Sequence, residues 1–311
     1  MILVTGGSGR IGSLLVEGLL KKGERVRVLD KREPGVKPTE FVEGSLSNIK
    51  TLHYALRGVD TVYHLAASID YEASMGEMRR RNVEPTRRLV RMAQDWPIAQ
   101  FIFVSSTSVY GVQKKGEKLT EKSECKPLNN YGRSKLECEQ ILKSSGLKYT
   151  ILRPSTVYGP GFKEGFAAVL KAIQDEKMPV FGSGNNKIPM LHINDFISLL
   201  LLIKGDQRAL YETFNIDSGY GATQKQFLEV SAEVLGVKKP EKHMNVWLTK
   251  LLCKFKGKKG RTMTRNINKL TLDRYVSVLK AVNVLGWAPE VELKEGIKGV
   301  VEEFRKEGIL R

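Results

Sequence analysis

Short apolar runs alternate with segments of helical periodicity along the first half of the chain. The apolar runs predict strands at residues 2–5, 25–30, 61–65, 101–105 and 149–152. The segments between them repeat apolar residues every three or four positions and predict helices at residues 12–22, 48–56, 83–92 and 131–143. Because strands and helices alternate in this way, we expect βαβ units and an α/β fold built on a doubly wound parallel sheet.

Glycine and proline become frequent after residue 155, and the pattern of elements changes there. This half predicts a strand at 213–216 and helices at residues 166–176, 194–202, 224–235 and 293–307. We expect the strand, near 213–217, to return to the first sheet. The chain is thus predicted to divide into a sheet domain, residues 1–155, and a smaller C-terminal α/β lobe, residues 156–311.

The composition excludes several classes of protein. Hydrophobic side chains make up 41% of the 311 residues and charged side chains 27%, which is typical of a globular chain and not of a disordered one. The longest strongly apolar run, residues 196–203, is shorter than the roughly 20 residues that a membrane-spanning helix needs. Three widely spaced cysteines, Cys125, Cys138 and Cys253, predict neither a disulfide framework nor a metal site. Together with an apolar start at Met1, which leaves no charged leader, they favour a cytoplasmic protein.

Much of the net charge is concentrated in one segment. The chain carries 51 Lys and Arg against 34 Asp and Glu, a formal charge of +17, and residues 238–265 contribute eight Lys and two Arg against one Glu, a net +9. Apolar residues recur there at near-helical spacing, at Val246, Trp247, Leu248, Leu251, Leu252 and Phe255. A basic amphipathic helix of this kind can cover its own lobe, steer an anionic substrate, or lie on an anionic membrane through residues 245–259. We favour the first of these, and we expect no nucleic-acid partner because no recognition motif accompanies the charge.

A glycine-rich loop joins the first predicted strand to the first predicted helix. Gly6, Gly9 and Gly12 follow the strand. The first glycine permits a tight turn, the second lets a pyrophosphate approach the backbone, and the third lets helix and strand pack closely. The helix N-terminus, which includes Arg10 and Ile11, offers amide groups to the phosphates. This arrangement predicts a Rossmann-type dinucleotide site.

The end of the second predicted strand bears on which dinucleotide binds. Asp30 lies there, 18 residues beyond Gly12, where its carboxylate can accept hydrogen bonds from an adenosine ribose and would repel a 2′-phosphate. Lys31 and Arg32 follow it and could neutralise such a phosphate. We therefore predict NAD as the cofactor and keep NADP as the alternative.

Tyr131 and Lys135 are four residues apart, so a helix places them on one face, one turn from each other. A tyrosine ordinarily titrates near ~10, and a nearby ammonium together with the charge of an oxidised nicotinamide favours the phenolate. We expect this environment to lower the pKa of Tyr131 and to make it a general acid and base.

Further motifs accompany the glycine loop and this pair along the whole chain. They are HLAA at His64–Ala67, Asn82 with Val83, SSTSVYG at 105–111, LRP at Leu152–Pro154 and HIND at His192–Asp195. With these motifs the sequence resembles the extended short-chain dehydrogenase/reductase family, of the NAD-dependent epimerase/dehydratase type. The resemblance implies that residues 1–155 bind NAD and that residues 156–311 bind substrate.

The resemblance also implies roles for individual residues. Ser106 would hydrogen-bond the reacting oxygen, Tyr131 would be the acid and base, and Lys135 would support Tyr131 and hold the nicotinamide ribose. Asn82 would support this set, with a helix cap as the competing interpretation. Other positions implied to contact the cofactor are Ser45 and Leu46 beside the adenine, Leu65, Ala66 and Ala67 after the third strand, and Pro154 and Val157 near the nicotinamide.

The residues after Ser106 separate the reactions that this resemblance implies. Related 4,6-dehydratases usually carry an Asp-Glu pair directly after the catalytic residue, and Thr107 and Ser108 stand there instead, so we expect no dehydratase. The leading hypothesis is an NAD-dependent nucleotide-sugar 4-epimerase or dehydrogenase. Its candidate substrate contacts are Ser106, Thr107, Lys187 and His192, of which Lys187 is nearest to the position of a diphosphate-binding Arg in related enzymes.

Two other functions stay open. The runner-up is an NAD(P)-dependent dehydrogenase or reductase of a hydrophobic alcohol or ketone, similar to 3β-hydroxysteroid dehydrogenases or dihydroflavonol reductases, with an apolar pocket roofed by Trp247 and Leu251. The third is a non-catalytic dinucleotide sensor, which the presence of both Tyr131 and Lys135 disfavours. The arginine-rich helix around Asn82 is often a dimer interface in the family, so we predict a homodimer, with a solvated face as the alternative.

Overall fold

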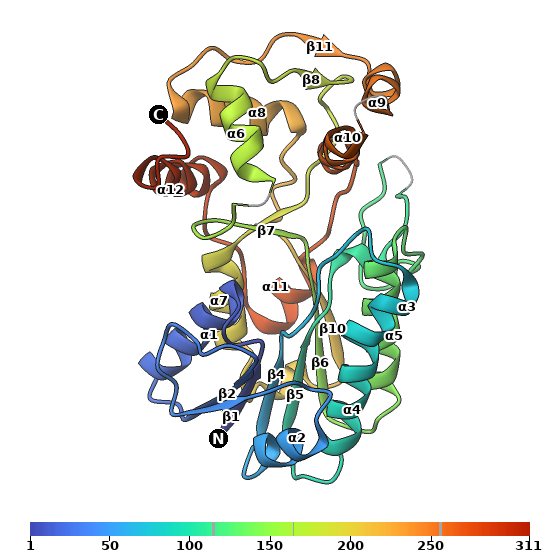
Figure 1. Ribbon diagram of the computed structural model, residues 1–311, viewed down its shortest axis with the longest axis vertical. Helices are drawn as coiled ribbons and strands as arrows, with labels where there is room; N and C mark the ends of the chain where they lie inside the picture. The colour runs from blue at the N-terminus through green and yellow to red at the C-terminus, as the bar shows by residue number, and fades with distance from the viewer. Residues whose placement is uncertain (114–115, 164, 255–256) are drawn as a thin grey trace.

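A seven-stranded parallel sheet forms the centre of the protein in a computed structural model that describes residues 1–113, 116–163, 165–254 and 257–311 (Figure 1). The side chains at 258, 259, 261, 262 and 265 also lie outside this description. The strands are β1 (Ile2–Thr5), β2 (Val26–Asp30), β3 (Glu40–Glu43), β4 (Thr61–His64), β5 (Gln100–Val104), β6 (Tyr149–Pro154) and β10 (Glu212–Ile216). Their order is β10-β6-β5-β4-β1-β2-β3. All carboxyl ends therefore meet at one edge, and the order reverses between β1 and β4, where sheets of this kind bind ligands.

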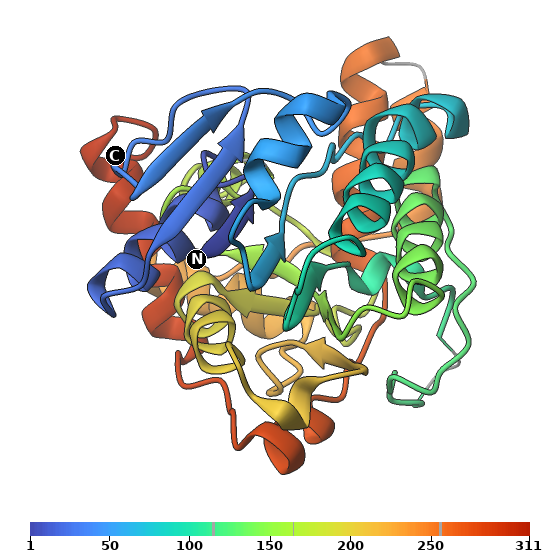
Figure 2. The same cartoon turned by 90° about the horizontal axis from the view of Figure 1, so that it is seen from below.

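Helices cover both faces of this sheet (Figure 2). One face packs against α1 (Arg10–Lys21), α7 (Ile193–Leu202) and α11 (Leu279–Leu285), and the other against α2 (Ile49–Leu56), α4 (Glu84–Ala93) and α5 (Asn130–Lys143). Helix α4 continues from α3 (Met75–Met78) through a π-helical turn, Arg79–Val83, and 3-10 turns occupy Thr107–Val109 and Gln207–Ala209. Every residue of β1, β4 and β5 is buried, as expected for strands covered on both faces.

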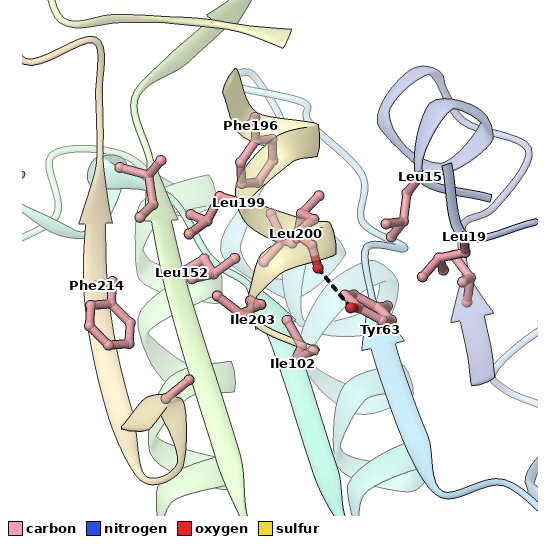
Figure 3. Close-up of a cluster of buried hydrophobic side chains, with 14 of the residues drawn as sticks. Leu15, Leu19, Tyr63, Ile102, Leu152, Phe196, Leu199, Leu200, Ile203 and Phe214 are labelled. Carbon is pink, nitrogen blue, oxygen red and sulfur yellow. Dashed lines mark hydrogen bonds between the residues drawn. The ribbon is translucent and has the colours of Figure 1, made fainter. Parts of the chain in front are cut away.

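One buried hydrogen bond ties the second half of the chain to the sheet (Figure 3). Leu15 and Leu19 of α1 and Leu199 and Leu200 of α7 belong to one apolar cluster with Tyr63 of β4. The Tyr63 hydroxyl, which is fully buried, donates to the carbonyl of Leu200 at 2.7 Å. A buried tyrosine thus satisfies its polar end on the last turn of α7, whose carbonyls have no partner within the helix.

A smaller lobe lies beyond the carboxyl edge of the sheet (Figure 1). It contains α6 (Phe166–Gln174), α8 (Gln224–Leu235), α9 (Val246–Lys254), α10 (Gly257–Thr271), α12 (Leu293–Lys306) and the strand pair β8 (Val180–Phe181) with β11 (His243–Met244). A second pair, β7 (Thr156–Tyr158) with β9 (Met190–His192), lies between this lobe and the sheet. None of the helices in the described ranges combines the length and the apolar character that a membrane span requires.

The predicted α/β architecture is confirmed, including the return of β10 to the sheet beside β6. The sequence pattern does not predict β3, an edge strand in which Phe41 and Val42 are the apolar residues, or the short helix α11. Helices α7 and α11 fall within the range predicted for the second lobe, yet both pack on the sheet. The boundary predicted at residue 155 stays a prediction, and the core that covers the sheet draws on both sides of it.

Tyr63→Phe is expected to lower the free energy of unfolding by about 1–2 kcal/mol, because the Leu200 carbonyl loses its buried donor. Urea unfolding followed by circular dichroism measures this change. Tyr54→Phe is the matched control, since the Tyr54 hydroxyl donates to Glu40 at 2.7 Å from a side chain that is 51% exposed. We expect the control to change the free energy by less than about 0.5 kcal/mol. Equal losses in the two variants would contradict a structural role for the buried bond.

Candidate active site

The glycine loop turns directly from β1 into α1 and leaves no room for side chains. Gly6 has a φ of +76°, and its amide donates to the carbonyl of Leu29 at 3.1 Å. A Cβ on Gly12 would lie 2.1 Å from the Gly6 carbonyl oxygen, a Cβ on Gly6 would lie 2.7 Å from the Ala66 amide nitrogen, and one on Gly9 would lie 3.2 Å from the Gly6 oxygen. The turn is therefore so tight that only glycine fits at these three positions, as the predicted pyrophosphate site requires.

The N-terminus of α1 has the character of a phosphate site. Gly9 is its N-cap, and within the described part of the chain no side chain caps this helix end and no acid lies in its first turn. The dipole and amides of the helix thus face the loop without an acid in the first turn of the helix to compete for them. Arg10 is exposed, with its guanidinium carbon 5.6 Å from the centre of the Phe162 ring, and Ile11 packs into the core. The residues present fit a dinucleotide phosphate.

Asp30 and the residues predicted to contact adenine lie together at the ends of β2 and β3. The Asp30 carboxylate accepts hydrogen bonds from the amides of Ser8 at 3.0 Å and Lys31 at 2.7 Å, which braces the glycine loop. The Asp30 carbonyl accepts from the Gly44 amide at 2.8 Å, which brings Ser45 to the same edge. Leu46 packs against the core beneath. Leu65, Ala66 and Ala67 follow β4, the next strand but one in the sheet.

Ser106, Tyr131 and Lys135 are brought together where β5 ends. Tyr131 and Lys135 lie on α5 and are 6% and 3% exposed, and Ser106 follows β5, close enough to the Tyr131 phenol to affect its pKa. The Lys135 ammonium donates to the carbonyl of Val104 at 2.8 Å and lies 6.0 Å from the centre of the Tyr131 ring. The structure thus assembles the three side chains that the sequence predicts as catalytic.

Burial is the main cause of the pKa shifts of Tyr131 and Lys135. It raises the pKa of the Tyr131 phenol, the neighbouring Tyr71 adds to the rise, and the hydrogen bond with Ser106 opposes it. The Lys135 ammonium is hydrogen-bonded to Val104 and does not offset this rise. The lowering of the Tyr131 pKa by Lys135 together with an oxidised nicotinamide stays a prediction. Burial also lowers the pKa of Lys135 to about 8. A further positive charge beside the phenol is needed before it can ionise near neutral pH.

Asn82 holds the loop after β4 against α5. Its side chain is 3% exposed; the amide oxygen accepts from the Ser68 amide at 2.8 Å, and the amide nitrogen donates to the Ser68 carbonyl at 3.0 Å and to the Ser134 hydroxyl at 3.2 Å. Asn82 does not cap a helix, because it lies in the π-helical turn and Val83 is the N-cap of α4. It is a positioning residue that joins the strand end of Ala66 to the helix that carries Tyr131.

A buried ion pair anchors α5 from behind the catalytic set. Arg153 of β6 donates to both carboxylate oxygens of Glu139, at 2.9 and 2.6 Å, and the two side chains are 3% and 1% exposed. The Ser105 hydroxyl donates to the same carboxylate at 2.6 Å, and Arg153 also donates to the Tyr110 hydroxyl at 2.7 Å. The sequence analysis missed this pair. The available signal was that Glu139 lies four residues after Lys135, just as Lys135 lies four residues after Tyr131, which places all three on one face of the helix.

The predicted substrate contacts divide into two groups. Thr107 follows Ser106 in a 3-10 turn, and Lys187 lies with its ammonium 4.1 Å from the centre of the Tyr275 ring. The Lys118 ammonium lies 4.6 Å from the centre of the same ring, so two cations converge on one tyrosine. Lys118 is a candidate that the sequence did not single out, because it belongs to no motif.

The second group lies in the layer between the sheet and the lobe. His192 is 5% exposed, packs edge-on against Tyr158, and accepts a hydrogen bond from the Asn194 amide at the start of α7. This capping role leaves its predicted substrate contact without support from the structure. Pro154 ends β6 at the carboxyl edge, and Val157 belongs to β7 and packs against the core of the sheet.

Two residues at the site carry no sequence signal, because they lie in irregular segments far from the motifs. The ring of Tyr71 packs edge-on against that of Tyr131, with centroids 5.5 Å apart. Arg274 is 8% exposed and donates to the carbonyls of Tyr110 and Gly111, both at 3.1 Å. Arg274 thereby holds the loop that begins at Ser106, across a sequence separation that no pattern reveals.

The comparison with protein families rests on the part of the chain that builds this site. The sequence model of the NAD dependent epimerase/dehydratase family matches residues 2–217, which run from β1 through β10. The chain belongs to this family. Among its relatives, a UDP-glucose 4-epimerase of Vibrio cholerae is 28% identical over 319 residues, which cover 97% of this chain and 95% of the relative.

Solved structures of the NAD dependent epimerase/dehydratase family agree with the fold. A UDP-glucose 4-epimerase of Thermotoga maritima, solved with UDP-glucose, is 27% identical with a TM-score of 0.78 and covers 98% of this chain and 99% of that one. A UDP-glucuronic acid 4-epimerase of Bacillus cereus, solved with NAD, superposes with a TM-score of 0.80 over 98% of this chain and 99% of that one. At 23% identity the second likeness concerns the fold alone.

Asp217 is a buried acid at the end of β10 in this family member. Burial raises its pKa to about 7. One carboxylate oxygen accepts from the Gly219 amide at 3.0 Å, while the other oxygen and the Ser155 hydroxyl are both buried without a hydrogen-bond partner in the described residues. The carboxyl therefore holds a proton in the folded state at pH values where an exposed aspartate has lost it.

Gly12→Ala is expected to weaken NAD binding about tenfold or more, equivalent to about 1.4 kcal/mol, because the new Cβ displaces the Gly6 carbonyl at the turn. Isothermal titration calorimetry with NAD measures the dissociation constant. Gly35→Ala is the matched control, since no heavy atom lies within 4 Å of a Cβ at that position. Unchanged NAD affinity in the Gly12 variant would contradict the assignment of the loop.

Asp217→Asn is expected to remove a pH dependence of stability. The folded-state pKa of about 7 lies above the ordinary value of 3.8, so the folded chain binds a proton that the unfolded chain lacks between these values. Stability from this group is therefore complete below about pH 4 and is lost as the pH rises through about 7. Urea unfolding should find the variant more stable than the original chain at pH 8, by about 1–3 kcal/mol, with a smaller gain at pH 5. A pH-independent difference would contradict the assignment.

Proposed function

We propose that the protein is an NAD-dependent nucleotide-sugar 4-epimerase. The observation that carries this proposal is the convergence of Ser106, Tyr131 and Lys135 at the edge of the sheet that also bears the glycine loop. Membership of the NAD dependent epimerase/dehydratase family supports it, and so do the names of the relatives from Vibrio cholerae and Thermotoga maritima, which are both UDP-glucose 4-epimerases.

The proposed cofactor is NAD, which the Bacillus cereus neighbour binds by the name of its structure. The tight turn at Gly6 and the start of α1 would hold the pyrophosphate, and Asp30 would accept hydrogen bonds from the adenosine ribose. Lys135 would hold the nicotinamide ribose, with its ammonium fixed by Val104. When bound and oxidised, NAD supplies a hydride acceptor and a positive charge beside the Tyr131 phenol.

The side chains of the catalytic set would then move one proton in each direction. Tyr131 takes the proton from the hydroxyl at C4 of the sugar while a hydride leaves the same carbon, which gives a 4-keto sugar. Ser106 donates a hydrogen bond to the oxygen on which negative charge develops. Once the sugar has turned and the hydride has been restored to the opposite face, Tyr131 would give its proton back to the oxygen. The sugar leaves with C4 inverted and no net oxidation.

The residues after Ser106 support epimerisation over dehydration. A 4,6-dehydratase has to remove and add protons at neighbouring carbons, which requires further acid and base groups. Thr107 and Ser108 occupy the positions directly after Ser106, and neither hydroxyl titrates near neutral pH. The set therefore has one acid–base group for one hydroxyl, which suits an epimerase.

A diphosphate in the substrate is supported by the cations around Tyr275. The ammonium groups of Lys118 and Lys187 approach its ring within 4.6 and 4.1 Å, and the neighbouring Arg274 holds the loop that carries Ser106. Both lysines thus lie around Tyr275, the residue that follows Arg274. Two ammonium groups at this position can bind the diphosphate of a nucleotide-sugar. Trp247 does not roof an apolar pocket, since it is 71% exposed, so this element of the hydrophobic-substrate alternative is wrong.

The homodimer and the cytoplasmic location stay predictions. The arginines around Asn82 form ion pairs within the chain, since Arg79 pairs with Glu137 and Arg81 with Asp70. These pairs suit a solvated helix face as well as an interface.

Tyr131→Phe is expected to reduce 4-epimerisation by about 10²–10⁴-fold, because the proton acceptor is removed, while NAD affinity stays unchanged. The assay incubates the protein and NAD with UDP-, dTDP- and GDP-sugars and separates the 4-epimers by chromatography. Tyr211→Phe, at a side chain that is 53% exposed, is the matched control and should keep full activity. Absence of turnover across the whole panel would contradict the nucleotide-sugar proposal, and full activity in Tyr131→Phe would remove Tyr131 from the mechanism.

A further inference from the structure

Helix α9 presents three of its large apolar side chains to solvent, while Val246 at its start packs against the core of the lobe. Trp247 is 71% exposed, Leu248 50% and Leu252 52%, whereas the side chains that this helix buries are Thr249 at 7% and Cys253 at 3%. An amphipathic helix that covers its own lobe has the opposite arrangement. The helix does cover part of its own lobe, through Val246, Thr249 and Cys253, but its three exposed apolar side chains take no part in that contact.

The exposed side chains of α9 form one continuous face. With 100° between successive helical positions, the exposed residues 247, 248 and 252 and the partly exposed residue 251 fall within an arc of about 140°. The Asn245 side chain caps the start of this helix by accepting hydrogen bonds from the amides of Trp247 and Leu248, at 2.9 and 3.1 Å. Phe255, which the sequence places on the same stripe, lies outside the described residues together with Lys256.

Positive charge surrounds this face. Lys254 is exposed at the C-terminal end of α9, Lys250 is partly exposed, and Lys238, Lys239 and Lys242 are exposed in the segment that leads into the helix. None of these lysines forms an ion pair within the part of the chain that the structure describes. The surrounding segment, residues 238–265, carries a net charge of +9. An apolar strip bordered by lysines is complementary to a lipid bilayer, whose acyl chains are apolar and whose headgroups can be anionic.

The position of α9 leaves this face accessible and connects it to the catalytic set. Figure 1 shows α9 at the outer end of the smaller lobe, away from the N-terminal sheet. A cavity of about 380 Å³ lies beside the helix and is lined by Cys253, Lys254, Gly257, Gly260, Thr264 and Tyr71, among others. Tyr71 also packs edge-on against Tyr131. The exposed helix and the proposed acid–base group are thus separated by one cavity and one side chain.

We propose that α9 is an interfacial helix that docks the protein on an anionic phospholipid surface through Trp247, Leu248 and Leu252. Tryptophan favours the boundary between headgroups and acyl chains, and each lysine near an anionic leaflet strengthens attachment. A second copy of the chain fits the face less well, because a symmetric contact would bring two segments of charge +9 together. The helix lies in the plane of the surface and does not cross it.

Sedimentation with lipid vesicles tests this docking on the full chain. The protein should bind vesicles of phosphatidylcholine mixed equally with phosphatidylglycerol, should not bind phosphatidylcholine alone, and should be released by added salt. The double variant Trp247→Ser with Leu248→Ser should lose about tenfold in partitioning. Lys250→Gln and Lys254→Gln should each cost about fivefold.

Matched controls keep the result specific. Ile49→Ser with Leu279→Ser removes two apolar side chains of similar exposure, 66% and 60%, from other faces, and Arg87→Gln with Arg88→Gln removes two exposed charges from α4. Both should bind vesicles as the original chain does. Absence of binding to the mixed vesicles, an equal loss in the controls, or a concentration-dependent dimer that the α9 variants abolish would each overturn the proposal. Vesicle binding by Tyr131→Phe should be unchanged, so this test and the catalytic assay fail independently.

Discussion

The buried ion pair between Glu139 and Arg153 is the constraint on which the candidate site depends. It joins α5 to β6, and the same carboxylate accepts a hydrogen bond from Ser105 at the end of β5. Because Tyr131 and Lys135 precede Glu139 by two turns and one turn on the same helix face, the ion pair sets how these side chains stand over the sheet edge. Removing one partner would leave the other as an uncompensated buried charge, which costs about 3–5 kcal/mol.

Desolvation then gives this edge its chemical character. Burial raises the pKa of Tyr131, lowers that of Lys135 to about 8, and raises that of Asp217 to about 7, in each case because the charged form loses its hydration. The same effect lowers the pKa of His64 to about 3, so this histidine stays neutral between Thr5 and Thr86, to which its two ring nitrogens are hydrogen-bonded. The site is therefore built to respond to a charge that arrives with a ligand, and the nicotinamide of NAD is the charge that our proposal supplies.

Helix α9 differs from the other helices of the smaller lobe in where its apolar side chains lie. Elsewhere in this lobe, α6, α8 and α12 bury their apolar faces against one another, which accounts for its core. At α9 the apolar face is turned outwards and small or polar side chains are turned inwards. The concentration of charge in residues 238–265 thus belongs to a surface with its own binding chemistry, and it lies next to the cavity that leads to Tyr71.

Local pattern in the sequence determined the βαβ order, the glycine loop at Gly6–Gly12 and the pairing of Tyr131 with Lys135, because each of these depends on spacings of a few residues within one element or turn. The sequence could not reveal that Arg274 holds the loop of Ser106, or that Tyr71 packs on Tyr131, because those contacts join segments that only the folded chain brings together. It also could not show that burial raises the pKa of the Tyr131 phenol, or that α9 leaves Trp247, Leu248 and Leu252 exposed. Both depend on how much water the tertiary structure excludes from a side chain, and that quantity is set by every neighbour in space and not by spacing along the chain.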